Sequence, residues 1–109
     1  MSKKLKIKFD GAEYLLEYTR TTALALEQAG FSLSDIKRKP VSSLMTLFRG
    51  AFMANHKRVE TETVDRMFES MPDKTKLLSV LVGMYDETVS ALMEDPSGDE
   101  GNAEWTAIP

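Results

Sequence analysis

Two stretches within the first eighteen residues alternate between polar and apolar side chains, and this pattern restricts the fold more than any other feature of the chain. Residues 4–9 alternate lysine with a large apolar residue, which is typical of a strand with one buried face. Asp10-Gly11 follows, a pair favoured in tight hairpin turns because both positions tolerate positive φ. The alternation resumes with Tyr14, Leu16 and Tyr18. The chain is therefore expected to begin with a β-hairpin.

A two-stranded hairpin is only marginally stable in water by itself. Its lysines are expected to face Glu13 and Glu17 across the ladder, and such cross-strand pairs contribute a few tenths of a kcal/mol each. The apolar face therefore needs a cover, and the rest of the sequence predicts helices.

Four helices are expected after the hairpin, and their boundaries follow from capping residues and apolar spacing. Thr21 or Thr22 is expected to cap the first helix and Gly30 to end it. Residues 32–36 predict a single short turn. Thr61 is the expected cap of the third helix, and the last has the widest apolar face, which predicts the central element. The expected helical ranges are 23–29, 41–55, 61–70 and 74–93.

Composition and charge predict one domain with a distinct tail. The chain has 109 residues, of which 42% are apolar, and it has no cysteine, which excludes disulfides and thiolate chemistry. It has no apolar run long enough to span a membrane. Residues 94–109 hold five acids and no base, whereas residues 1–93 hold twelve acids and fourteen bases. We therefore expect a single α+β domain over 1–93 and a flexible acidic tail over 94–109.

The sequence has no pattern that predicts catalysis, a cofactor or a metal. His56 is the only histidine, and we expect it to place a favourable charge at a helix C-terminus. It has no second ligand at a suitable spacing. The glycines form no phosphate-binding loop. We therefore expect a protein that is not an enzyme and has no catalytic, cofactor-binding or metal-binding residues.

Two basic clusters, Lys37-Arg38-Lys39 and Lys57-Arg58, lie in predicted loops at opposite ends of the second helix. They are the basis of one alternative, a small helical regulator that binds nucleic acid. No predicted helix has a basic face suited to base edges, so solvated charge is the preferred interpretation.

Methionines and the tail suggest where a protein partner could bind. Flexible thioether side chains fill core gaps, and they also occur on surfaces that accommodate partners. Trp105 lies beyond the acidic stretch, where a large aromatic residue is expected to dock on the body or on a partner. The candidate partner-binding residues are Met45, Met53, Met67, Met71, Met93, Trp105 and Ile108.

The chain resembles the small tail assembly chaperones of long-tailed (siphovirus-type) bacteriophages or prophages, over nearly its full length. The resemblance rests on an ordered series of short motifs rather than on a catalytic signature. These motifs are Phe9-Asp10-Gly11 with Tyr14, residues 29–36, Pro40, residues 47–52, Asn55-His56, Met84-Tyr85 and residues 102–105.

The resemblance implies a non-enzymatic protein that binds the tape measure protein and tail tube subunits during tail morphogenesis. It implies a location in the cytoplasm of the infected or lysogenic bacterial host and absence from the mature virion. A helix-in-groove contact could shield the apolar face of a tape measure until tube subunits surround it. The second alternative is a structural tail or head–tail connector subunit. Homo-oligomerisation stays open.

Overall fold

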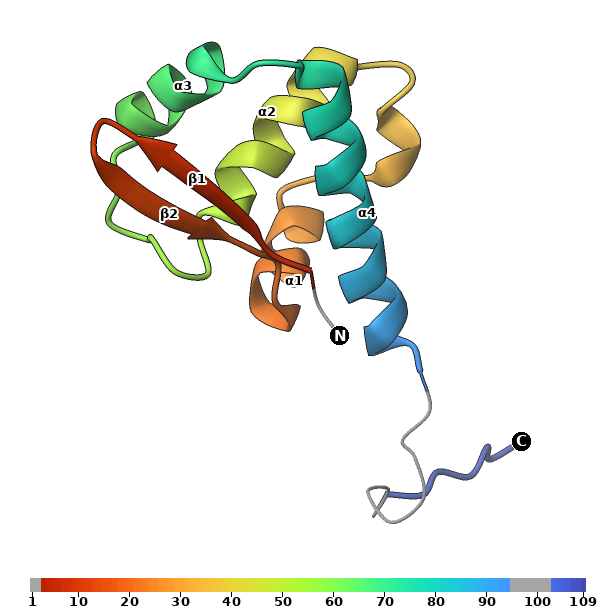
Figure 1. Cartoon of the computed structure of the whole chain (residues 1–109). Coiled ribbons are helices and arrows are strands. Elements are labelled where there is room, and N and C mark those ends of the chain that lie inside the picture. Colours follow the sequence, from red (N-terminus) through yellow and green to blue (C-terminus); the bar gives the residue numbers. More distant parts are fainter. Residues whose placement is uncertain (1–2, 95–102) are drawn as a thin grey trace.

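The computed structural model describes residues 3–94 and 103–109, and it has an α+β fold (Figure 1). An N-terminal antiparallel hairpin is followed by four α-helices, which confirms the predicted fold class. The predicted flexibility of the tail concerns residues that lie partly outside the described ones. The elements are β1 (Leu5–Phe9), β2 (Ala12–Leu16), α1 (Arg20–Gln28), the 3-10 turn η1 (Leu33–Asp35), α2 (Pro40–Ala51), α3 (Thr61–Ser70) and α4 (Lys74–Leu92).

The hairpin forms as the alternation predicts. Asp10 and Gly11 have φ values of 49° and 80°, so the turn uses the left-handed region that this pair tolerates. The strand register places Lys8 opposite Glu13, and their side chains form an ion pair at 3.7 Å. Lys4 approaches Glu17 at 4.0 Å. The expected lysine–glutamate pairing is therefore confirmed.

β2 ends at Leu16, before the alternation ends, because the chain turns into α1. Thr19 is the N-cap of this helix, and its Oγ1 accepts a hydrogen bond from the Thr22 N–H at 3.2 Å. The Thr22 hydroxyl accepts from the Thr19 N–H in return, at 2.8 Å. The predicted cap at Thr21 or Thr22 is thus wrong, since Thr22 is the third helical residue of a capping box. At the other end Gly30 has a φ of 99°, as expected for a residue that ends a helix.

α2 begins with Pro40 at its first position, where the missing N–H costs nothing. It ends at Ala51, four residues before the predicted end at Asn55. Beyond it the backbone N–H of His56 donates to the carbonyl of Phe52 at 2.8 Å, which forms an isolated turn. α3 starts at Thr61 itself, with Glu60 rather than Thr61 as its N-cap. α4 runs from Lys74 to Leu92 with Met93 as its C-cap, close to the predicted range.

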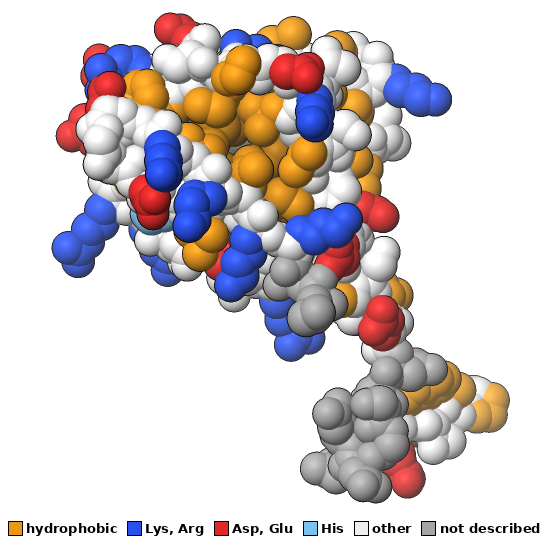
Figure 2. Space-filling view, in the orientation of Figure 1, with side chains coloured by type: hydrophobic (Ala, Val, Ile, Leu, Met, Phe, Trp, Pro, Cys, Tyr) orange, Lys and Arg blue, Asp and Glu red, His pale blue; other side chains and the backbone are white. Residues whose placement is uncertain are grey.

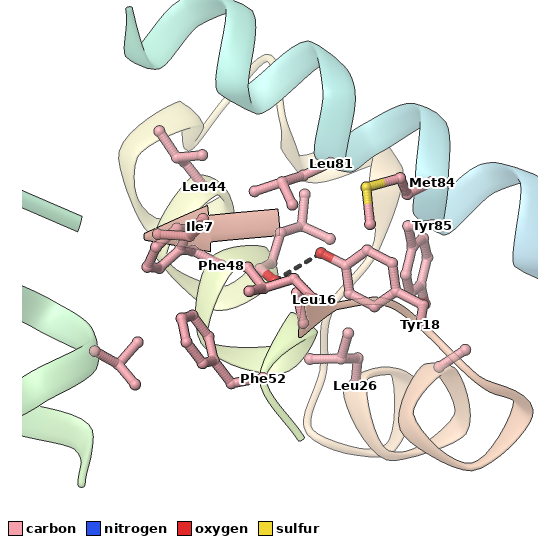
Figure 3. Close-up of a cluster of buried hydrophobic side chains, with 14 of the residues drawn as sticks. Ile7, Leu16, Tyr18, Leu26, Leu44, Phe48, Phe52, Leu81, Met84 and Tyr85 are labelled. Carbon is pink, nitrogen blue, oxygen red and sulfur yellow. Dashed lines mark hydrogen bonds between the residues drawn. The ribbon is translucent and has the colours of Figure 1, made fainter. Parts of the chain in front are cut away.

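The core lies around α2, which packs against α1, α3 and α4. The prediction that the last helix is the central element is therefore wrong. The wide apolar face of α4 is only partly used, since three of its residues are buried. Figure 3 shows the cluster where hairpin, α2 and α4 meet. Its labelled members are Ile7, Leu16, Tyr18, Leu26, Leu44, Phe48, Phe52, Leu81, Met84 and Tyr85.

A buried hydrogen bond fixes the end of the hairpin to α2. The Tyr18 hydroxyl donates to the Leu47 carbonyl at 2.6 Å, along the dashed line in Figure 3. Burial raises the pKa of the Tyr18 phenol far above its ordinary value, and the neighbouring Tyr85 raises it further. The phenol therefore stays a neutral donor over the whole range in which proteins are usually handled.

Candidate functional site

One face of the molecule gathers apolar side chains in a hollow between the hairpin, α3 and α4 (Figure 2). We call this surface the front apolar face. Its members belong to three elements, and all of them except Val80 are packed on the core while remaining partly accessible. They are Leu5 and Phe9 on β1, Phe68 and Met71 at the end of α3, and Leu77 and Val80 on α4.

The side of α4 that faces the hairpin is identified by one contact. The Thr88 hydroxyl donates to the carbonyl of Tyr18, directly after β2, at 3.4 Å. Leu77 lies eleven positions before Thr88 and therefore on the same stripe of the helix, and Val80 is three positions after Leu77. From this spacing we assign both side chains to the border of the hollow, and Val80 is 38% exposed.

Two cations border the aromatic end of this face. The Arg66 guanidinium lies 5.8 Å from the centroid of the Phe9 ring, and the Lys74 ammonium lies 5.4 Å from that of Phe68. Lys74 is held in place because its Nζ donates to the Met71 carbonyl at 2.9 Å. An apolar surface with a basic border fits an amphipathic segment whose polar side is acidic.

The methionines selected from the sequence differ in how exposed their side chains are. Met71 belongs to the front apolar face, and Met45 is half-buried on α2. Met53, after the end of α2, is 39% exposed, and Met93 is 82% exposed at the end of α4. The prediction that Met67 binds a partner is wrong, because its side chain is fully buried in the core.

A second apolar surface lies between α1 and the last turns of α4, and we call it the α1–α4 groove. It is a depression of about 340 Å³ lined mainly by apolar side chains. Its apolar side chains are Ala23, Leu24, Val89, Leu92 and Met93, and Arg20 and Glu27 complete it. Trp105 and Ile108, also predicted to bind a partner, are 87% and 91% exposed. The structure therefore does not place these two residues against the body.

His56 does not cap a helix, which corrects the role expected for it. Its Nε2 accepts a hydrogen bond from the backbone N–H of Leu15 at 2.9 Å. The neighbouring Asn55 amide donates to the Leu15 carbonyl at 3.2 Å and to a Glu17 carboxylate oxygen at 2.8 Å. Asn55 and His56 together satisfy both polar backbone atoms of Leu15. They fasten the outer edge of β2 to the turn after α2, with Tyr14 and Phe52 packed around the imidazole.

We call the hydrogen bonds from Asn55 and His56 to the backbone of Leu15 the clamp. The sequence did not predict it, because its partners are about forty positions apart. The only signal was the Asn55-His56 motif, which the resemblance included without assigning it a contact. The clamp uses the acceptor that a general base would need, so His56 has a structural role in this fold.

Among the described residues, one of the five cations in the two basic clusters is paired, and so is a neighbouring arginine outside them. The Arg38 guanidinium donates to the Asp35 carboxylate at 2.8 Å. On α2, Arg49 binds Asp65 of α3 through two hydrogen bonds of 2.9 and 2.8 Å, and these bonds raise the pKa of Arg49. Across residues 3–94 and 103–109, no three His, Asp or Glu side chains gather in a group able to hold a metal. In the same residues no helix is long and apolar enough to cross a membrane.

Comparison with known proteins found one family. A family model described as a domain of unknown function (DUF5055) matches residues 1–108. No curated protein and no solved structure matches the chain.

Proposed function

The chain belongs to this family of domains of unknown function (DUF5055), and we propose that it is a tail assembly chaperone of a long-tailed bacteriophage or prophage. In this proposal it acts without catalysis. It binds the tape measure protein and the tail tube subunits in the cytoplasm of the bacterial host, and it is absent from the mature virion.

The front apolar face is the observation that carries the proposal. A tape measure is long and largely helical, so its apolar side needs cover before the tube assembles around it. The hollow between hairpin, α3 and α4 offers partly exposed apolar side chains from three elements. Helix-in-groove contacts use such a surface, with anchors spaced by three or four positions on the incoming helix.

The border of the face supports a particular orientation of that helix. Arg66 and Lys74 stand at the aromatic end, above Phe9 and Phe68. Acidic side chains flanking the apolar stripe of the tape measure helix would meet these cations. Such rim charges chiefly speed association and set the register rather than provide affinity.

The alternative of nucleic-acid binding has less support. Duplex DNA requires several cations aligned along one surface. Here Arg38 is engaged by Asp35, and the two clusters lie at opposite ends of α2. The other alternative, a structural tail or connector subunit, predicts that the chain stays in purified particles. The chaperone proposal predicts that it does not.

Co-purification of the full chain with a helical fragment of the tape measure protein tests the proposal. Val80→Glu places a charge on the front apolar face at a side chain that is already 38% exposed, so the fold should be retained. We expect this variant to bind the fragment roughly tenfold or more weakly, because a charge must be desolvated.

Leu24→Glu is the matched control, since Leu24 is 52% exposed on α1 and lies outside the front apolar face. It should bind the fragment as the unchanged chain does. No binding by the unchanged protein, or equal binding by the Val80→Glu variant, would contradict the proposal.

A further inference from the structure

We infer that the C-terminal segment carrying Trp105 and Ile108 docks in the α1–α4 groove of its own chain. This inference does not depend on the proposed chaperone function. It concerns an intramolecular contact, and it can be measured on the isolated protein.

Several large apolar side chains of the groove are left exposed to solvent. Leu24 is 52% exposed on the outer side of α1, and Leu92 is 44% exposed on the last turn of α4. Met93, the C-cap of α4, is 82% exposed. These side chains line a single depression together with Val89, so a ligand placed there would cover all of them at once. Removing such area from water is the main source of affinity in an apolar site.

The segment has the complementary composition. Trp105 and Ile108 are the two most exposed large apolar side chains among the described residues, at 87% and 91%. They are three positions apart, so one short segment carries both. A tryptophan covers a large apolar area with little loss of side-chain freedom, which suits it to anchor an otherwise polar segment.

The length of the connection permits the contact within one chain. Twelve positions separate Met93 from Trp105. An extended chain covers about 3.3 Å per residue, so these positions span up to roughly 40 Å. The groove lies beside Met93 itself, where the segment departs, and α1 is only about 14 Å long at 1.5 Å per residue. A short tether of this kind holds the segment at a high effective concentration near the groove, which favours its own chain over a second copy.

Charge adds a direction to the contact. Arg20 stands at one end of the groove, and none of the ion pairs among the described residues involves it. Glu104 directly precedes Trp105, so the docked tryptophan brings a carboxylate with it. Glu27 also lines the groove, two turns along α1, and it disfavours the reverse orientation because it would repel that carboxylate. The segment is therefore inferred to enter with Glu104 towards Arg20.

Tryptophan fluorescence of the full chain tests the inference, because Trp105 is the only tryptophan. We expect the emission of the folded protein to lie at shorter wavelength than after unfolding in urea, with reduced quenching by acrylamide. Leu24→Glu should move the emission to that of an exposed indole while circular dichroism stays unchanged. Arg20→Glu should produce part of the same shift, and Val80→Glu, on the front apolar face, should produce none.

Two outcomes would overturn the inference. One is a folded protein whose tryptophan already emits and is quenched as a fully exposed indole. The other is a blue shift that grows with protein concentration alongside a dimer in sedimentation velocity, which would assign the groove to the segment of a second copy. Neither outcome bears on tape measure binding, so the two proposals fail separately.

Discussion

His56 accepts a hydrogen bond through its Nε2 from the backbone N–H of Leu15, at 2.9 Å and across 41 positions of the chain. The contact requires an unprotonated Nε2, which places the ring proton of the neutral imidazole on Nδ1. With the Asn55 amide on the Leu15 carbonyl, it gives the free edge of β2 the partners that another strand would supply. The hairpin is thus held to the helices through its backbone as well as its apolar face.

Replacing this acceptor should destabilise the fold. His56→Ala leaves the partly buried Leu15 N–H without its partner, so we expect a loss of about 1–2 kcal/mol in the free energy of unfolding. His56→Gln should lose less, because an amide oxygen can accept the same bond. The loss would be measured by urea denaturation, with Lys57→Ala at the exposed neighbouring position as control. An unchanged midpoint for His56→Ala would show that the clamp contributes nothing.

The clamp also shows where prediction from sequence succeeds and fails. The hairpin was predictable because its signals are local: alternation, the Asp10-Gly11 turn and the Lys8–Glu13 pair. The early end of α2 was not, since Ala51 is followed by residues that are compatible with a helix. Its position reflects tertiary contacts, such as the Glu17 N–H donating to the Ala51 carbonyl at 3.1 Å. Long-range contacts of this kind leave no trace in a local pattern.

The candidate surfaces were predictable only in part for the same reason. Helical spacing predicted that Leu77 lies on the apolar stripe of α4. It could not predict that this part of the stripe faces the hairpin. The methionine pattern selected Met71, which borders the front apolar face, and Met67, which is buried one turn earlier. Residue type indicates what a side chain tolerates, whereas its exposure depends on what packs against it.

Two buried tyrosines should respond in opposite ways to loss of their hydroxyl. The Tyr18 hydroxyl donates to the Leu47 carbonyl at 2.6 Å, so Tyr18→Phe should lower the free energy of unfolding by about 1–2 kcal/mol. The Tyr85 hydroxyl is buried with no hydrogen-bond partner among the described residues. Tyr85→Phe should therefore be neutral or stabilising, because it removes a desolvated polar atom. Thermal unfolding of both variants checks this, and an equal loss in both would contradict it.

The same tyrosines predict a loss of stability in alkali. Burial raises the pKa of Tyr18 and also that of Tyr85, where the charge of Glu27 adds to the effect. In the unfolded chain both phenols ionise near pH 10. Their contribution to stability is therefore complete below about pH 10 and is lost as the pH rises above it, since only the unfolded state releases the protons. Urea midpoints between pH 8 and 11 should fall less steeply in the Tyr18→Phe, Tyr85→Phe double variant, which lacks both phenols.

Replacing each of two helical glycines by alanine should change the free energy of unfolding in opposite directions. A Cβ on Gly83 meets no atom within 4 Å, so Gly83→Ala should stabilise the protein by about 0.5–1 kcal/mol through helix propensity. A Cβ on Gly50 would lie 2.8 Å from Leu26 Cδ2, 3.0 Å from its Cδ1 and 3.2 Å from its Cγ, so the whole buried side chain would have to shift. Overpacking of about 1–3 kcal/mol should then exceed the helical gain at Gly50. Chemical denaturation of the two variants measures these changes. A stabilised Gly50→Ala variant would show that Leu26 on α1 can move aside without cost.

The same substitution, leucine to alanine, should cost much more stability at a buried position than at an exposed one. Leu81 is fully buried on α4, in the cluster of Figure 3 with Leu44 and Ile7. Leu81→Ala removes packed atoms where α2 and the hairpin restrict collapse, and it should cost about 2–5 kcal/mol. Leu24→Ala, at a side chain that is 52% exposed, should cost less than about 1 kcal/mol. Urea unfolding measures both. A loss below about 1 kcal/mol for Leu81→Ala would mean that α4 is not anchored in the core where the structure places it.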